Sequence, residues 1–292
     1  MQRFRGTLTA LVTPFRGGAI DYAALEAHVE RQIAGGVDGL VPCGTTGESP
    51  TLTPEEQRGV VECVVRTANG RVPVLAGAGS NCTAHAVELA RTMRDCRVDG
   101  LLVVAPYYNK PSQQGLFEHF GQIATAVELP IVLYNIPGRC GVEIAPETIR
   151  RLHEAHPTIV AVKHATGGMA DAAELLVSCE IDVLSGDDPL TLPLMSLGAV
   201  GVISVASNLA PRAVKRLTQA ALAGDFEAGR AAHGALWSLS RALLSLDTNP
   251  VPVKTAMAVK GWCAEEFRAP LCQMGASRRA QLISVVHACE LD

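Results

Sequence analysis

The chain alternates short apolar runs with longer amphipathic segments almost to its C-terminal end, and no other feature restricts its fold as strongly. Buried parallel strands have this continuous apolar character, and repeated strand–helix units form a parallel sheet. At about 25 to 30 residues per unit, eight units favour a closed (β/α)8 TIM barrel over an open sheet. The predicted strands span residues 8–12, 39–42, 72–76, 100–104, 131–134, 159–163, 183–185 and 200–204.

Helix-start signals support the helices between these strands. Thr53-Pro54-Glu55-Glu56 places a capping hydroxyl before a proline and two acidic residues, and Ala145-Pro146-Glu147 and Ala210-Pro211 also begin with proline. The first turn, residues 12–18, lacks the Gly-x-Gly-x-x-Gly fingerprint of dinucleotide-binding sheets. The predicted helices span residues 22–34, 55–68, 84–96, 114–127, 146–153, 169–177 and 189–197.

The strand signal stops near Ala223. Residues 226–246 and 273–289 have helical patterns, and a proline-rich stretch at 247–253 is predicted to be irregular. We therefore expect a catalytic barrel over residues 1–223 and a helical C-terminal extension over residues 224–292.

Composition excludes several classes of protein. Hydrophobic residues make up 48% and charged residues 18%, which is typical of a globular chain with a large core. The net charge of −4 provides no basic field for nucleic acid. No apolar run approaches the ~18 residues of a membrane span, and the N-terminal run is too short for a signal peptide. The nine cysteines contain no Cys-x-x-Cys pair, so reduced thiols in a cytoplasmic protein are expected.

A lysine, Lys163, stands where a buried strand ends, in Ile159-Val160-Ala161-Val162-Lys163. Burying an ammonium is costly unless it is paired or loses its proton, so burial favours the neutral amine that attacks carbonyls. Alternatively, the side chain extends to solvent and has no chemical role.

Other strand ends carry unusual residues, and catalytic groups of such barrels lie at these C-terminal ends. Three of the four tyrosines fall there, at Tyr107, Tyr108 and Tyr134. Tyr134 and Lys163 end adjacent strands, so a phenol could shuttle protons for an amine that forms a Schiff base. The alternative is a buried tyrosine whose hydroxyl is satisfied elsewhere.

Two further segments suit carboxylates. The loop Gly44-Thr45-Thr46-Gly47-Glu48-Ser49 offers hydroxyls and backbone N–H groups for a small carboxylate, although an ordinary turn has the same composition. Arg139 could hold a second carboxylate or lie free in solvent.

Asp187-Asp188 suggests either a metal or phosphoryl site or, more simply, a helix N-cap. His153 and His156 lack carboxylate-rich partners, so no metal is expected. His164 should point to the opposite side of its strand from Lys163.

Together these motifs resemble the dihydrodipicolinate synthase family, within the pyruvate-dependent class I aldolase (N-acetylneuraminate lyase) superfamily. The resemblance runs from about Gly6 to Lys254 and so covers nearly the whole chain. It rests on Gly44-Thr-Thr-Gly-Glu-Ser49, Pro106-Tyr-Tyr-Asn-Lys-Pro111, Tyr134-Asn-Ile-Pro-Gly-Arg139, Val162-Lys-His-Ala-Thr-Gly167, Ser185-Gly-Asp-Asp188, Gly201-Val-Ile-Ser-Val205 and Asn249-Pro-Val-Pro-Val-Lys254.

The resemblance implies a role for each matching residue. Lys163 would form the Schiff base with pyruvate. Tyr134, Thr45 and Tyr108 would form a proton relay, with Tyr108 reaching in from a neighbouring subunit. These four are the implied catalytic residues.

The implied substrate-binding residues are Thr46, Arg139, Ile203 and Gly186. Thr46 would hold the pyruvate carboxylate, Arg139 the carboxylate of L-aspartate 4-semialdehyde, and the Ile203 carbonyl would lie near the pyruvate methyl group.

The implied activity is that of a lyase: aldol addition of pyruvate to the semialdehyde and cyclisation to 4-hydroxy-tetrahydrodipicolinate, in the biosynthesis of diaminopimelate and lysine. The Schiff base on the lysine accepts the electron pair, so no metal or organic cofactor is implied. The implied assembly is a homotetramer of two tight dimers. The alternative within the superfamily is a lyase acting on a 2-keto-3-deoxy sugar acid, sialic acid or a hydroxyproline-derived substrate.

The sequence departs from the family pattern in two places. His164 stands where glutamate is usual. In the feedback site for lysine, which lies at a subunit interface in many members, His85 replaces an acidic residue, and Pro54 and Gln57 replace polar or histidine residues. We therefore expect weak or absent inhibition by lysine. The positions matching that site are Ser49, Pro50, Pro54, Gln57, Asn81, His85 and Tyr107.

Overall fold

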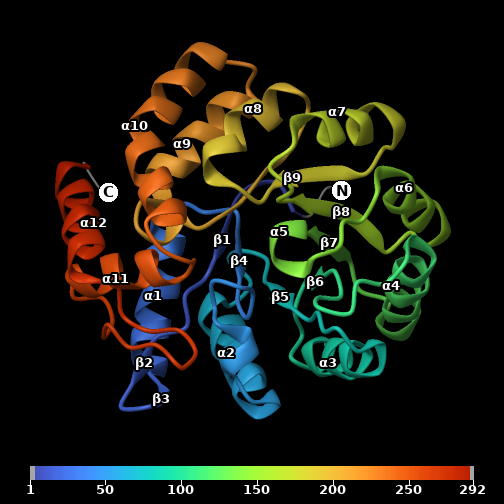
Figure 1. The fold of residues 1–292 in the computed structure, drawn as a ribbon, viewed down its shortest axis with the longest axis horizontal. Helices are drawn as coiled ribbons and strands as arrows, with labels where there is room; N and C mark the ends of the chain where they lie inside the picture. The colour runs from blue at the N-terminus through green and yellow to red at the C-terminus, as the bar shows by residue number, and fades with distance from the viewer. Residues whose placement is uncertain (1–3, 290–292) are drawn as a thin grey trace.

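A single eight-stranded parallel sheet lies at the centre of the protein (Figure 1). The structure is a computed structural model that describes residues 4–289. The strands follow chain order around the barrel: the first barrel strand pairs in parallel with the last, and a parallel bridge between Leu40 and Val74 joins the second to the third. The eight strands are β1 (Gly6–Ala10), β4 (Gly39–Val41), β5 (Leu75–Gly77), β6 (Gly100–Val104), β7 (Ile131–Asn135), β8 (Ile159–His164), β9 (Asp182–Ser185) and β10 (Gly201–Ser204). The TIM barrel predicted from the alternation of strands and helices is confirmed.

Helices surround the sheet, and Pro54, Pro146 and Pro211 lie in the first turns of three of them, as the sequence predicts. Thr53 and Glu56 form a reciprocal capping box at the start of α2, and Ser112 caps α4. Most boundaries agree with the predicted ones to within two residues. The barrel helices are α1 (Tyr22–Ala34), α2 (Pro54–Ala68), α3 (Thr83–Asp95), α4 (Gln113–Val127), α6 (Pro146–Ala155), α7 (Met169–Ser178), α8 (Thr191–Ser196) and α9 (Pro211–Leu222).

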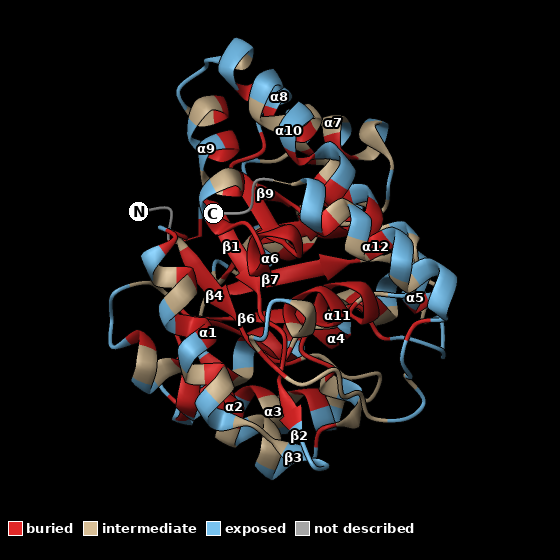
Figure 2. Ribbon diagram, turned by 90° about the vertical axis from the view of Figure 1, so that its left-hand side faces the viewer, coloured by how far each residue is buried: buried red, intermediate tan, exposed pale blue. Residues whose placement is uncertain are grey.

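The strands are buried on both faces (Figure 2). Their outward side chains pack against helices such as α2 and α4, whereas Leu102, Val132 and Leu184 belong to a smaller cluster from the inward faces. A filled barrel of this kind is a packed core, so the space for a ligand lies at its rim.

The structure differs from the predictions in three segments. The turn after β1 contains a hairpin of β2 (Phe15–Arg16) and β3 (Ala19–Ile20), and the Arg139 loop is a single helical turn, α5 (Pro137–Cys140). The proline-rich stretch predicted to be irregular begins the helix α11 (Val251–Val259). Prolines are tolerated in a first turn because its N–H groups have no helical partner.

The chain beyond residue 223 forms α10 (Phe226–Ser245), α11 and α12 (Ala276–Ala288), which lie on one side of the barrel next to α1 (Figure 1). Polar contacts join this part to the barrel: Arg268 forms a bidentate pair with Glu56 of α2, and the Arg31 guanidinium of α1 stacks 4.1 Å from the Trp262 ring centroid. The predicted division at residue 223 stays a prediction. Between residues 4 and 289 no helix is both long and apolar enough to cross a membrane.

A buried histidine links α1 to the barrel. His28 has no exposed surface, and its Nε2 lies 2.9 Å from Asn208 Oδ1, which also accepts a hydrogen bond from Val12 N. The Asn208 side-chain amide donates to Ala10 O and Val205 O, so its oxygen faces the imidazole as an acceptor. Burial lowers the pKa of His28 to about 4.

Because His28 is buried in its neutral form, we expect the folded protein to lose stability in acid. The unfolded chain binds a proton near pH 6.5, but folded His28 stays neutral until about pH 4, so its contribution is complete above pH 6.5 and is lost as the pH falls towards 4. The loss is on the order of 3 kcal/mol for this residue. Urea unfolding of the wild type and of His28→Gln between pH 7 and pH 4 should show a shallower pH dependence in the variant.

The matched control is His287→Gln on the exposed side of α12, which should keep the wild-type pH dependence. Identical slopes for wild type and His28→Gln would contradict the prediction.

Candidate active site

Strands β7 and β8 place Lys163 beside Tyr134. The two residues are register partners in the parallel ladder, so both side chains leave the same face of the sheet. Each side chain is 5% exposed, and Lys163 Nζ lies 4.2 Å from the centroid of the Tyr134 ring. The structure therefore brings the predicted pair together, with the amine over the face of the ring.

Gly186, at the end of β9, borders the lysine side chain. A Cβ atom at this position would lie 3.0 Å from Lys163 Cε and 2.7 Å from the Ala165 Cβ, and the Gly186 N–H donates to His164 O at 2.7 Å. Any larger residue would push against the lysine, so the glycine leaves the space in which the amine lies.

The acidic pair after Gly186 supports the backbone of the neighbouring strand end. Asp188 accepts hydrogen bonds from Ser204 Oγ (2.5 Å), Val205 N (2.9 Å) and Ala206 N (3.0 Å). It thus holds the end of β10, which carries the buried Ile203, and the start of η3 (Ala206–Asn208). The prediction that this acidic pair caps a helix is wrong for Asp187, because the short helix that follows it, η2 (Asp188–Leu190), has no side-chain cap.

Burial raises the pKa of both Asp187 and Asp188, and the positive charge of Lys163 opposes the rise in each case. The Asp187 Oδ1 atom is buried with no hydrogen-bond partner in the described structure. Across residues 4–289, no three His, Cys, Asp or Glu side chains gather as they would around a metal ion.

The loop after β4 is a compact turn that separates its two threonines. Gly47 N donates to Gly44 O and Glu48 N donates to Thr45 O, both at 3.1 Å. Thr45 lines the cavity described below, whereas Thr46 is 2% exposed and its Oγ1 accepts a hydrogen bond from Asn249 Nδ2 at 3.0 Å.

Asn249 also contacts Arg139, whose Nη2 donates to Asn249 O at 3.0 Å. One residue from the C-terminal part therefore contacts both side chains that the resemblance assigns to carboxylates. Sequence reasoning gave Asn249 no role, although it begins a motif that carries the resemblance.

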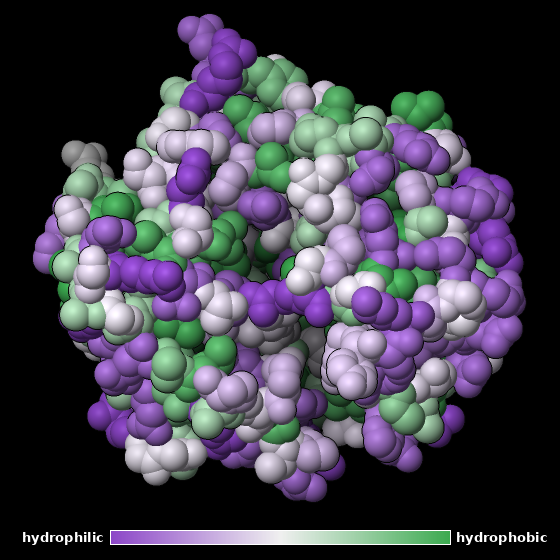
Figure 3. All heavy atoms as spheres, in the orientation of Figure 1, coloured by the Kyte–Doolittle hydropathy of each residue, from purple (hydrophilic) through white to green (hydrophobic). Residues whose placement is uncertain are grey.

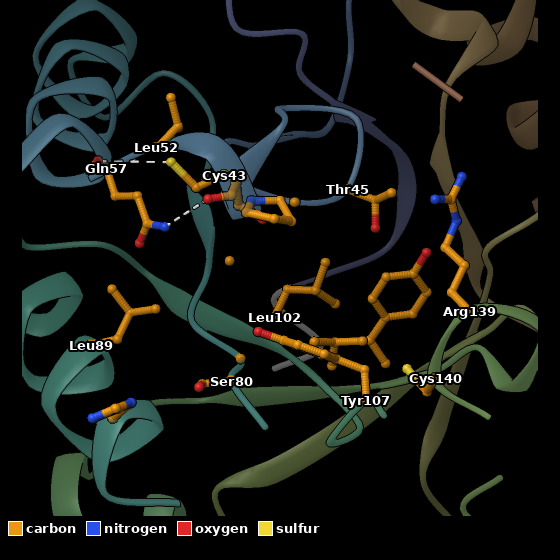
Figure 4. A pocket seen from close by; sticks show the side chains of 18 of the residues that line it. Cys43, Thr45, Leu52, Gln57, Ser80, Leu89, Leu102, Tyr107, Arg139 and Cys140 are labelled. Carbon is orange, nitrogen blue, oxygen red and sulfur yellow. Dashed lines mark hydrogen bonds between the residues drawn. The ribbon is translucent and has the colours of Figure 1, made fainter. Parts of the chain in front are cut away.

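A cavity of about 760 Å³ opens at this end of the barrel. The space-filling view shows the surface hollowed near the centre of this face (Figure 3). In the close-up, Thr45 and Arg139 lie at one side of the cavity and Leu89 and Gln57 at the other (Figure 4). Tyr134 also lines it, whereas Lys163 is not among the lining residues, so the cavity reaches the pair at the tyrosine.

The same cavity is lined by most of the positions that match the regulatory site of the family. Asn81 is not among its lining residues; its carbonyl accepts a hydrogen bond from Asn109 Nδ2. An exposed glutamate, Glu88, lies one helical turn from His85. The matching positions that line the cavity are Ser49, Pro50, Pro54, Gln57, His85 and Tyr107.

Tyr108 does not join the site within one chain. Its side chain is 89% exposed, its φ is +76°, and its N–H donates to Cys140 O at 3.2 Å. A large apolar ring held outward in this way is available to another molecule, and the predicted contribution to a neighbouring subunit stays a prediction.

His164 has a structural role, as expected from its position opposite Lys163. Its Nε2 lies 2.8 Å from Gly168 O and 2.9 Å from Thr166 Oγ1, so it orders the turn after β8. His153 likewise contacts a backbone carbonyl, that of Ile159.

Known proteins resemble this chain along nearly its whole length. The model of the dihydrodipicolinate synthetase family matches residues 3–289. The 4-hydroxy-tetrahydrodipicolinate synthase of Pelobacter propionicus is 52% identical over 97% of this chain and 98% of its own, and that of Geobacter sulfurreducens is 49% identical over 99% of both. The crystal structure of dihydrodipicolinate synthase from Aquifex aeolicus superposes with a TM-score of 0.96 at 47% identity, covering 98% of each chain. The chain belongs to the dihydrodipicolinate synthetase family.

Proposed function

We propose that this chain catalyses the condensation of pyruvate with L-aspartate 4-semialdehyde and its cyclisation to 4-hydroxy-tetrahydrodipicolinate, in the biosynthesis of diaminopimelate and lysine. The observation that carries the proposal is the buried amine of Lys163 against Tyr134 at adjacent strand ends, next to a cavity that Tyr134 and Arg139 line. Full-length relatives at about half identity are named for this reaction.

The first half of the reaction forms a Schiff base. The Lys163 nitrogen attacks the ketone carbon of pyruvate, and protons carried by Tyr134, Thr45 and Tyr108 convert the carbonyl oxygen into a leaving water molecule. The product is an iminium ion. Thr46 holds the pyruvate carboxylate, with its hydroxyl oriented by Asn249.

The second half forms the carbon–carbon bond. The iminium nitrogen acidifies the neighbouring methyl group, and the proton lost from it leaves an enamine near the Ile203 carbonyl. The enamine carbon adds to the aldehyde of the semialdehyde, whose carboxylate Arg139 holds. The amine of that substrate then displaces Lys163, which closes the ring and frees the enzyme. Because the lysine nitrogen accepts the electron pair, the scheme uses no metal or organic cofactor.

The alternative activity is that of another class I lyase, acting on a 2-keto-3-deoxy sugar acid, sialic acid or a hydroxyproline-derived substrate. Such enzymes need the same lysine, so Lys163 does not discriminate between them. The names of the relatives and the position of Arg139 at the cavity favour the synthase.

The proposed assembly is a homotetramer of two tight dimers, in the cytoplasm. Two exposed apolar regions support an assembly: Tyr107 and Tyr108 after β6, and Val177 (90% exposed) and Leu197 (43% exposed) on α7 and after α8. Tyr108 completes the proton relay only if a second chain supplies it.

Replacing the nucleophile tests the chemistry directly. Lys163→Ala should lose pyruvate-dependent labelling by borohydride, which reduces the iminium, and its kcat/KM should fall by at least about 1000-fold. Mass spectrometry of the intact chain measures the label. Lys260→Ala, which removes an exposed lysine after α11, is the matched control and should label as the wild type does. Persistent labelling of Lys163→Ala would refute the assigned nucleophile.

A substrate panel tests the second substrate. Pyruvate consumption should be fast with aspartate 4-semialdehyde and near background with sugar acids or hydroxyproline-derived substrates. Arg139→Ala should raise KM for the semialdehyde roughly 30-fold, because a charged hydrogen bond contributes about 2 kcal/mol. Labelling by pyruvate alone should be retained. Cleavage of a sugar acid instead would keep Lys163 but overturn the proposed substrate.

Inhibition by lysine should be weak or absent, because His85 stands at the position of the family's acidic residue, and the carboxylate of Glu88 lies one helical turn away from it. Initial rates measured with low-millimolar L-lysine should match those without it, and His85→Glu should introduce sensitivity. Half-inhibition of the wild type at low-millimolar concentrations or below would contradict this expectation.

A further inference from the structure

The structure contains a buried ion pair next to the catalytic loop. Lys254 of α11 and Glu48 have fully buried side chains, with Lys254 Nζ 2.6 Å from Glu48 Oε1. The ammonium also lies 3.9 Å from the Phe15 ring centroid, and Arg268 N donates to Glu48 Oε2 at 3.5 Å. Burying two charges gives little or no net stability over apolar residues of the same shape, so stability alone does not explain the pair.

Glu48 ends the turn that carries the two threonines. Its φ of +54° and ψ of 34° are left-handed, a conformation that non-glycine residues adopt only when their surroundings hold them. Its N–H closes the turn on Thr45 O. Thr13 Oγ1 donates to the adjacent Gly47 O at 2.7 Å, so a side-chain hydroxyl of the barrel holds the turn from that side.

The C-terminal part contacts two residues of the turn, Thr46 and Glu48, from the other side. Asn249, just before α11, donates to Thr46 Oγ1, and Lys254, inside α11, pairs with Glu48. The buried residues of α11 pack in a hydrophobic cluster with residues of α9, α10 and α12, so the position of this helix fixes the position of both contacts.

We propose that the buried Lys254–Glu48 pair is a positioning device for the synthase reaction: it fixes the turn of residues 44–48 so that Thr46 meets the pyruvate carboxylate and Thr45 stays in the relay. Lys254 and Glu48 are positioning residues, because they act through the threonines and do not touch the substrate. The proposal rests on the proposed function of this site.

The variants separate positioning from stability. Lys254→Met alone leaves a buried unpaired carboxylate and should lower the melting temperature. The double variant Glu48→Gln with Lys254→Met removes both charges at nearly constant shape, and it should melt close to the wild type. It should nevertheless raise KM for pyruvate roughly tenfold and slow borohydride trapping of pyruvate, because small displacements of binding groups are costly. KM for the semialdehyde should stay within about twofold.

The matched control is Arg279→Met, which removes the pair with Glu265 inside the same C-terminal part, away from the turn. It should leave KM for pyruvate unchanged. A double variant that melts like the wild type and has wild-type KM and trapping rate would overturn the proposal. If the double variant does not fold, Lys254→Arg decides: a raised KM for pyruvate supports positioning, and a wild-type KM overturns it.

Borohydride trapping with pyruvate alone distinguishes a failure of this proposal from a failure of the proposed function. A wild-type protein that traps pyruvate but does not condense it with the semialdehyde refutes the proposed substrate and leaves the variant comparison intact. A wild-type protein that traps no pyruvate refutes the proposed function itself.

Discussion

The site depends on the parallel pairing of β7 with β8. Register partners in a parallel ladder leave the same face of the sheet at the same height, so the pairing of Tyr134 with Lys163 sets the distance between phenol and amine before any loop contributes. Closure of the barrel then brings β4 and β10 to the same rim, and with them the threonine turn and the Ile203 carbonyl. A slip of one residue in β8 would turn Lys163 to the opposite face, where His164 now lies.

The parts of the rim that strand pairing does not fix are held by side-chain hydrogen bonds from other segments. Asp188 holds the end of β10, and Asn249 joins Thr46 to Arg139. The region after residue 223 therefore contributes contacts to the candidate active site as well as packing on the barrel. Its contacts with the turn cross about 200 residues of sequence, and they connect the groups proposed to hold two different carboxylates.

Local patterns in the sequence predict most of the barrel, because a buried strand and an amphipathic helix each have a period that neighbouring residues reveal. They also predict Lys163 and Tyr134, since both lie where predicted strands end. Local patterns fail for Asn249 and Lys254, whose significance lies in partners distant in sequence. The prolines at 250 and 252 concealed α11, although they stand where a helix tolerates them. The exposure of Tyr108 was foreseeable only through the family resemblance, because nothing local turns a tyrosine outward.

Two lysines are buried among residues 4–289, and their surroundings explain why only one is proposed as the nucleophile. Burial lowers the pKa of Lys254, and Glu48 opposes that change from 2.6 Å. An ammonium held by a carboxylate and an aromatic ring has its lone pair occupied by a proton, so it cannot attack a carbonyl. Lys163 rests against the Tyr134 ring, and Gly186 leaves space beside its Cε. The same barrel thus holds one buried lysine in an ion pair for structure and places the other against Tyr134, which lines the cavity.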